Sequence, residues 1–537
     1  MYRAMMKILR CCLTLLALAL SVACAEPRVR PDPLPDNTRS PIGMNLGAWV
    51  DYSTTQPFVD LFRTARPFDD KLDLDEHGWV RSLRPGEVAQ TYLVWDLNGA
   101  YPSGHYHVFY DGKGRIDYGG AARRLTHRPG HDVINVKARE GGFWLRIVET
   151  DPKDYIRNIR VIMPGGTCRD DRTVWARTRE DCPPGQYLSF AEHYDEVVYN
   201  PAFLRFMRPY SVLRFMDTMR TNGSPVREWA DRARPDDATW STAAGAPLEV
   251  MVDMANRLRA DPWFTLPHAA SDDYVRRFAR YVKEHLDPAR KVYIEYSNET
   301  WNGQFPQFRY MIEQGKKRRL PGDQYQQGTE YYSERAVEIF RIFEDEFGGS
   351  ERLVRVLATQ AANAWLAEVI LSHKDAHKHA DALAIAPYFG GYLGDPGADT
   401  DRMSLAALFR ELRGKALREA IGWMRNHAKV AKKYGVDLIA YEGGQHLVGH
   451  GGAENNERLT RLFQRANRSP LMRPLYLHYL DAWKAAGGKL FVYYGQPGKY
   501  TKWGSWGIAE TLDQPRSAAP KLDAVLTFIE ENPRWWE

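Results

Sequence analysis

A regular alternation of strand and helix patterns from residue 200 onward constrains the fold of this chain more than any other feature. Seven short β-rich segments recur there with helical stretches between them, and an eighth lies far upstream. This rhythm is typical of a parallel sheet, and eight such units predict a (β/α)8 TIM barrel, an α/β fold. The predicted strands are residues 42–49, 211–216, 263–268, 291–296, 353–358, 383–388, 437–442 and 489–494.

The first two barrel strands are separated by a segment of a different kind. Six short alternating strands occur between residues 85 and 165, punctuated by turn pairs such as Asp111-Gly112. They predict an antiparallel β-sandwich inserted into the barrel. Its aromatics, among them Tyr101, Tyr106 and Trp144, either fill its core or form a carbohydrate-binding surface.

The chain's 537 residues suit one barrel and one accessory domain. Without three positive charges in the leader, the net charge is near +2, which gives no electrostatic case for binding nucleic acid. The predicted parts are a signal peptide at 1–25, a Pro-rich linker at 26–40, the catalytic barrel at 41–60 and 200–537, the sandwich at 85–165 and a connecting loop at 166–199.

The leader predicts export. A basic start precedes an apolar run and the small residues around Cys24, as in a cleavable signal peptide, and the run is too short to span a bilayer. A second interpretation is a lipoprotein signal, in which Cys24 carries a lipid anchor. The protein is then either periplasmic or extracellular, or held at a membrane by that anchor.

Two cysteines remain after the leader, Cys168 and Cys182. In an oxidising compartment an isolated pair predicts a disulfide, which would close the connecting loop. A metal site needs more ligands than the surrounding sequence offers, so neither a metal nor a cofactor is expected.

Two carboxylates stand at the ends of predicted barrel strands. The fourth strand stops at Asn298-Glu299, and the seventh stops at Glu442, before two glycines. Because a barrel keeps its chemistry at the carboxyl ends of its strands, the two side chains should face each other. Carboxyl groups about 5 Å apart perform retaining glycoside hydrolysis, one as nucleophile and one as acid/base. Asn298 would hold the sugar's 2-hydroxyl.

Structural interpretations stay open for each acid, because Glu299 could cap the next segment and Glu442 could be a solvated loop residue. Glu295, deeper on the fourth strand, is predicted to join a buried network. Asn456-Glu457 repeats the dipeptide in a charged loop with no strand before it, so we do not expect it to be catalytic.

The barrel, at about 42–53 and 205–510, resembles the glycoside hydrolases of clan A, the superfamily that contains the family 5 cellulases. The resemblance implies that Glu299 is the acid/base and Glu442 the nucleophile. It also implies roles for an Arg on strand two, a His after strand three and a Tyr on strand six, which Arg214, His268 and Tyr388 match. Ala386 replaces the His of the family's His-x-Tyr pattern, which weakens an assignment to family 5 itself.

Aromatic residues on predicted strand-end loops could line subsites for sugar rings, whose apolar faces stack on them; elsewhere such residues usually belong to a core. These residues are Trp49, Trp301, Trp503 and Trp506. The sequence thus predicts a retaining hydrolase of a β-linked polysaccharide or oligosaccharide, with no protein partner indicated. The alternative is a carbohydrate-binding protein on a barrel that has lost its activity.

Overall fold

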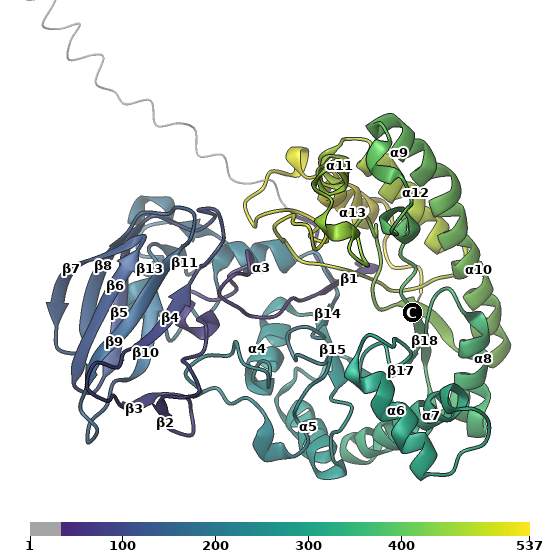
Figure 1. Cartoon of the computed structure of the whole chain (residues 1–537), viewed down its shortest axis with the longest axis horizontal. Coiled ribbons are helices and arrows are strands. Elements are labelled where there is room, and N and C mark those ends of the chain that lie inside the picture. Colours follow the sequence, from purple (N-terminus) through teal and green to yellow (C-terminus); the bar gives the residue numbers. More distant parts are fainter. Residues whose placement is uncertain (1–33, 537) are drawn as a thin grey trace, which may run out of the picture. The chain divides into compact units, whose positions relative to one another are not determined.

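The computed structural model describes residues 34–536 and contains a closed barrel of eight parallel strands (Figure 1). The first strand closes the ring, because β1 pairs with β14 on one side and with β20 on the other. The predicted barrel is therefore confirmed, with every strand at its expected place. In ring order the strands are β1 (Ile42–Asn45), β14 (Val212–Arg214), β15 (Asp261–Leu266), β16 (Val292–Tyr296), β17 (Leu353–Ala358), β18 (Ala382–Ile385), β19 (Asp437–Ala440) and β20 (Phe491–Tyr493).

Barrel strands are apolar along their whole length because both of their faces are covered. All four residues of β1 and of β18 are buried. Amphipathic helices supply the outer layer, and α5 buries one stripe that includes Val275 and Phe278. The helices of this part of the chain are α3 (Pro201–Met207), α4 (Leu248–Leu258), α5 (Asp272–His285), α6 (Pro306–Lys317), α7 (Gln324–Phe347), α8 (Ala364–Ser372), α9 (Leu405–Glu411), α10 (Leu417–Tyr434), α11 (Glu457–Arg468), α12 (Met472–Ala485) and α13 (Pro520–Glu531).

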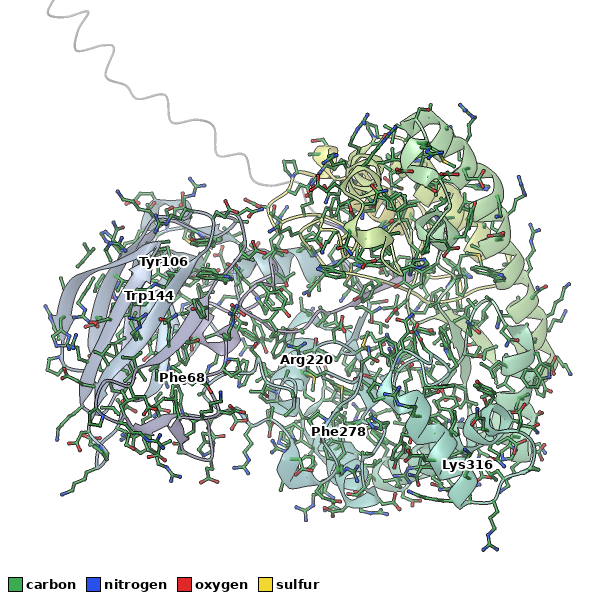
Figure 2. All side chains as sticks on the ribbon, viewed as in Figure 1. Phe68, Tyr106, Trp144, Arg220, Phe278 and Lys316 are labelled. Carbon is green, nitrogen blue, oxygen red and sulfur yellow. A yellow bond between two sulfur atoms is a disulfide. The ribbon has the colours of Figure 1, made fainter. Side chains whose placement is uncertain are left out.

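The segment between β1 and β14 contains two antiparallel sheets of longer strands, drawn in blue in Figure 1, and two small sheets of short strands. Tyr106 lies in one of the two sheets of longer strands and Trp144 in the other (Figure 2). The four-stranded sheet has the order β10 (Arg157–Ile162), β5 (Gly104–Asp111), β8 (His131–Val136) and β7 (Ala122–Arg128), and the three-stranded sheet has the order β4 (Ala89–Leu93), β9 (Phe143–Thr150) and β6 (Gly114–Gly120). Strand β7 was not predicted, because only Ala122 of its seven residues is buried.

Residues of both sheets pack into one apolar cluster. This cluster extends beyond residues 85 and 165, the predicted boundaries of the sandwich. It includes Phe62, Phe68 and Trp79 from the preceding segment and Phe190 from the following one. Tyr101 and Tyr106 are buried within it, so they form core and not an exposed binding surface. That these sheets form an inserted sandwich domain stays a prediction.

The residues before β1 do not all form a free linker. Asn37 donates from its side chain to the carbonyl oxygens of Tyr210 (3.1 Å) and Leu258 (2.9 Å), and Ser40 is buried. Residues 37–40 therefore belong to the barrel's packing, which corrects the end of the predicted linker. The signal peptide and Cys24 lie outside the described residues, and no helix within residues 34–536 has the length and apolar character needed to cross a membrane.

The predicted disulfide is confirmed. Cys168 and Cys182 are joined across 14 positions of sequence, and both sulfurs belong to a small buried cluster with Ala176. Strands β11 (Gly166–Cys168), β12 (Trp175–Ala176) and β13 (Tyr187–Ser189) form a small sheet around the bridge. The connecting loop is thus a folded element.

Candidate active site

The chain turns sharply where β16 ends. Ser297 (φ 61°) and Glu299 (φ 41°) both adopt the left-handed region, which costs a residue with a side chain about 1–3 kcal/mol. Such conformations cluster at functional sites because the surrounding structure must enforce them. Here they flank Asn298 and place it and Glu299 at the carboxyl end of the barrel.

Glu299 is half-buried and accepts hydrogen bonds at both oxygens. Asn302 Nδ2 lies 2.9 Å from Oε2, and the hydroxyl of Tyr441 lies 3.2 Å from Oε1. Tyr441 is the residue before Glu442, so this contact joins the end of β16 to the end of β19. Both donors are neutral, and either form of the carboxyl group is compatible with them.

Glu442 is 6% exposed and is held by a cation. The guanidinium of Arg214 donates from Nη1 to Oε1 at 2.9 Å, and the hydroxyl of Tyr388 donates to Oε2 at 3.0 Å. A charge-assisted bond of this kind favours the ionised carboxylate. The interpretation of Glu442 as a solvated loop acid is therefore wrong.

Arg214 is completely buried and uses all five of its N–H groups. Two of them reach Glu295, from Nε to Oε2 (3.0 Å) and from Nη2 to Oε1 (3.1 Å), and one reaches Asn45 Oδ1 (3.0 Å). Trp263 donates to Glu295 Oε2 as well, at 2.8 Å. The predicted buried role of Glu295 is confirmed, and Arg214 contacts it and Glu442 together.

Asn298 completes this network. Its Oδ1 accepts from Arg214 Nη2 (2.8 Å), and its Nδ2 donates to Asn222 Oδ1 (3.1 Å). Gln307 of α6 holds both Asn222 and the backbone oxygen of Asn298, each at 2.7 Å. Helix α6 was not predicted, because its few buried residues give it a weak apolar stripe. One N–H of the Asn298 amide remains for a ligand.

Burial raises the pKa of both carboxyl groups, and the nearby charge of Glu299 raises that of Glu442 further. Arg214 and Tyr388 oppose this rise at Glu442. The like charges of the two carboxyl groups raise the pKa of Glu442, which favours a state in which the pair holds one proton. The contacts favour that proton on Glu299, where no direct cation competes with it.

Sequence reasoning missed several residues of this site. Asp217, three positions after β14, accepts from the hydroxyl of Tyr494 at 3.1 Å, and its charge raises the pKa of Glu442. Tyr441, Asn45 and Asn302 were missed as well. A signal existed for Asn45, which ends β1 as a polar residue after three apolar ones. Nothing comparable marks Tyr441, whose ring also faces Arg214.

The rings of Tyr388 and Trp506 contact each other. Their ring centroids are 5.9 Å apart in an edge-on arrangement, and Trp506 Nε1 donates to the carbonyl oxygen of Trp503 at 2.8 Å. Trp503 itself is 64% exposed. This loop therefore presents one half-buried and one open indole beside the donor to Glu442.

The structure corrects one predicted subsite residue. Trp49 is only 3% exposed and packs against Phe58 (4.8 Å) and Trp240 (5.8 Å), so it has no free face for a sugar ring. Trp301 is half-buried, and its indole Nε1 has no hydrogen-bond partner among the described residues.

His268 follows β15 and is half-buried. Its ring packs edge-on against Tyr310 at 5.0 Å, and its Nδ1 lacks a partner among residues 34–536. Burial lowers the pKa of His268, and Arg227 adds to this effect. The imidazole is therefore kept neutral, but no contact among residues 34–536 joins it to Glu299.

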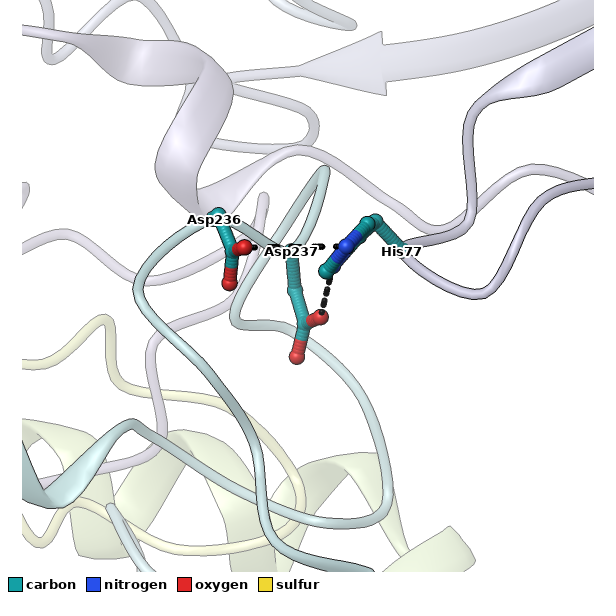
Figure 3. A group of neighbouring side chains, drawn as sticks. All are labelled: His77, Asp236 and Asp237. Carbon is teal, nitrogen blue, oxygen red and sulfur yellow. Dashed lines mark hydrogen bonds and ion pairs between the residues drawn. The ribbon is translucent and has the colours of Figure 1, made fainter. Parts of the chain in front are cut away.

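A separate polar group lies at the hairpin of β2 (Asp73–Leu74) and β3 (Val80–Ser82), where His77 sits between Asp236 and Asp237 (Figure 3). Asp237 contacts Nδ1 at 3.3 Å, and Asp236 contacts Nε2 at 3.6 Å. Because each carboxylate meets a different ring nitrogen, the group links the hairpin to the loop after β14 and does not converge on a single ligand position.

No protein-family model and no curated protein matches the sequence. Solved structures that are similar include a 4-O-α-L-rhamnosyl-β-D-glucuronidase from Fusarium oxysporum 12S (11% identity, TM-score 0.35), a family 26 endo-β-1,4-mannanase from Cellulomonas fimi (12%, 0.31) and a Bacteroidetes-affiliated GH5 cellulase (10%, 0.37). These matches cover 59%, 59% and 62% of this chain and 61%, 62% and 83% of the other chains, so this chain spans about three fifths of the first two. TM-scores this low carry no argument about family, substrate or activity.

Proposed function

We propose that this protein is an exported retaining glycoside hydrolase that cleaves a β-linked polysaccharide or its oligosaccharides. One observation carries the proposal: two carboxyl groups end β16 and β19, and only one of them, Glu442, is bonded to a buried cation. This asymmetry separates the roles that double displacement requires, an ionised nucleophile and a protonated acid.

In the first step, a carboxylate oxygen of Glu442 attacks the anomeric carbon while Glu299 gives its proton to the glycosidic oxygen. The bond between that oxygen and the anomeric carbon breaks, and the leaving sugar departs as an alcohol. The product is an ester between the remaining sugar and Glu442. Arg214 and Tyr388 hold Glu442 in position, and the free N–H of Asn298 can bind the hydroxyl beside the reacting carbon.

In the second step, Glu299, now ionised, takes a proton from water while the water oxygen attacks the anomeric carbon. The ester bond breaks, and Glu442 leaves as a carboxylate. Two inversions at one carbon return the original configuration. The half-buried position of Glu299 supports this exchange of its proton with the cleft.

The first test is a screen of the purified chain for release of reducing ends from gluco-, manno-, xylo- and galacto-configured β-glycans. We expect Glu299→Gln and Glu442→Gln each to lower the rate by about a thousandfold or more. Glu457→Gln is the matched control, since Asn456-Glu457 repeats the same dipeptide but Asn456 caps α11 and the Glu457 side chain is exposed. A protein that binds glycans yet releases no reducing ends is the carbohydrate-binding alternative.

The two roles are separated by azide on an aryl glycoside with a good leaving group. In Glu299→Ala, azide replaces water in the second step without needing a base, so activity returns and the glycosyl azide keeps the substrate's β configuration. In Glu442→Ala, azide takes the nucleophile's place, and the product is the α-azide. If Glu299→Ala gave the α-azide and Glu442→Ala gave the β-azide, the two roles would be reversed. Release of a sugar with inverted anomeric configuration by the unmodified protein would rule out double displacement.

A further inference from the structure

A histidine that the proposed chemistry does not use lies beside Tyr388. His446 follows Glu442 by four residues, and its ring centroid is 5.5 Å from that of Tyr388 and 5.0 Å from that of Trp506. Both contacts are edge-on, at 78° and 74°. The three rings contact one another pairwise. His446 therefore packs against the ring of Tyr388, whose hydroxyl donates to Glu442.

The main chain of His446 is fixed on the same wall. Its N–H donates to the carbonyl oxygen of Phe389 at 2.8 Å, and its own carbonyl accepts from Val448 at 3.1 Å. Phe389 directly follows Tyr388, so one backbone contact binds the loop after β19 to the loop after β18. The ring position is therefore set by the two loops that also position Tyr388.

The two ring nitrogens have different surroundings. Nδ1 is enclosed without a hydrogen-bond partner, and a Cβ on Gly391 would lie only 3.3 Å from it. The side chain as a whole is half-buried, so its accessible part lies elsewhere on the ring. No described residue bonds to Nε2. Neither nitrogen is therefore bonded within the described residues, and Nε2, the nitrogen away from Gly391, can take a partner from outside the chain.

Burial lowers the pKa of His446 to about 4, so near neutral pH the ring is uncharged. An uncharged imidazole has one N–H donor and one acceptor nitrogen. That combination matches a sugar hydroxyl, which both donates and accepts, whereas it offers no charge to an acidic or a basic ligand. The aromatic edges around it suit the C–H surface of the same ring.

On the basis of the proposed function, we infer that His446 is a sugar-binding residue whose Nε2 hydrogen-bonds a hydroxyl of a neutral sugar next to Tyr388. The residue sets specificity: a site built to bond a hydroxyl discriminates against a sugar that lacks the hydroxyl or carries it in the other orientation. His446 takes no proton in the reaction.

The test measures binding separately from hydrolysis, in a full-length Glu299→Gln background titrated by calorimetry with cellopentaose, mannopentaose and xylopentaose. His446→Phe keeps the ring packing but removes both nitrogens. We expect it to weaken the binding of whichever oligosaccharide binds most tightly by about tenfold. His446→Gln places an amide nitrogen near the position of Nε2 and should restore most of the affinity. His450→Phe is the matched control, since His450 is exposed on the same loop and contacts Asp395.

Equal affinity of the Phe variant and its background would overturn the inference, and so would the failure of all three oligosaccharides to bind. Hydrolysis by the unmodified chain with no effect of His446→Phe removes the inference and leaves the proposed function. Binding that depends on His446, in a chain that hydrolyses nothing, removes the proposed function and leaves the inference.

Discussion

Arg214 is the residue on which the candidate site depends. Among residues 34–536 it is the one cation bonded to Glu442, and the same guanidinium positions Glu295, Asn298 and Asn45. Burial acts against its charge, yet Glu295 and Glu442 raise the pKa of Arg214, so it stays charged at every working pH. A planar guanidinium can satisfy four partners at once, which the single ammonium of a lysine cannot.

At the same scale, Tyr388→Phe removes one donor from the proposed nucleophile. A hydrogen bond to a charged group contributes about 1.5–3 kcal/mol, so kcat/KM should fall about 10- to 100-fold. Tyr388 lowers the pKa of Glu442, so its loss raises that pKa. The nucleophile must be ionised to react, so as the pH is lowered the variant should lose activity at a higher pH than the unmodified protein does. A profile of kcat/KM against pH measures this shift.

Tyr434→Phe controls for the loss of a tyrosine hydroxyl bonded to a glutamate, since Tyr434 donates to Glu368 at 2.7 Å on the helical layer. It should leave the profile unchanged. If the low-pH side of the kcat/KM profile does not shift in Tyr388→Phe, then Glu442 is not the group whose ionisation limits activity.

At the scale of elements, the barrel was predictable because its strands are short, mostly apolar runs that lead into a polar or aromatic residue. Strand β17 has the predicted bounds, Leu353–Ala358. Strand β7 was missed because its exposed, charged side chains show no alternation, and α6 because its buried face is narrow. Pairs of strand-end residues such as Arg214 and Glu442 could be predicted, whereas the Tyr388, His446 and Trp506 rings meet only through tertiary packing of three loops.

The disulfide is an element whose removal can be measured. Cys168→Ser with Cys182→Ser opens a loop of about 15 residues, which should lower the free energy of unfolding by about 3 kcal/mol. Denaturant titration of both proteins tests this value. Activity of the folded variant should persist, because the bridge packs with Ala176 and Val174, in the small sheet of β11, β12 and β13. Loss of activity without loss of stability would contradict this separation.

Helix α13 is connected to the loop that carries Trp503 and Trp506 by a buried lysine. Lys521 is 1% exposed and donates to the carbonyl oxygen of Ser505 at 2.6 Å. Burial lowers its pKa well below the usual 10.5, so the unfolded chain binds a proton that the folded chain does not. By linkage, this residue's contribution to stability rises with pH until the unfolded lysine also deprotonates.

Lys521→Met removes that dependence. We subtract the unfolding free energy of the variant from that of the unmodified protein. This difference should increase between neutral pH and about pH 10, by up to about 1.4 kcal/mol for each pH unit. Chemical denaturation at several pH values measures it. A difference that stays constant would mean that the folded chain keeps Lys521 protonated.

At the scale of the molecule, the inserted sheets and the barrel loops share apolar packing. Phe62 stacks on Trp79 with centroids 5.6 Å apart, and Ala238 from the loop after β14 joins the same cluster. Lys499, on the loop after β20, also pairs with Asp96 at 2.9 Å. We therefore expect the inserted segment to be stabilised by the barrel and not to behave as an independent unit.

This expectation predicts one cooperative thermal transition for the chain. Trp79→Ala removes a nearly buried ring and should cost about 3–5 kcal/mol, lowering the midpoint of the whole transition. Calorimetry and the loss of activity should then report the same midpoint. Two resolved transitions, with only the first shifted by Trp79→Ala, would show an autonomous domain.

The place of the insertion also fixes an order of events during synthesis. Met44 of β1 pairs with Leu213 on one edge and Tyr493 on the other, so neither neighbour exists when β1 is made. At about 5–20 residues per second, the ribosome takes roughly ten to thirty seconds to go from β1 to β14, and β20 is made later still. An unpaired strand is a template for wrong association, and β1, with only four residues, offers few free backbone groups during that wait. The ring therefore cannot close until β20 is made, and a message truncated before β20 would yield an open sheet prone to aggregate.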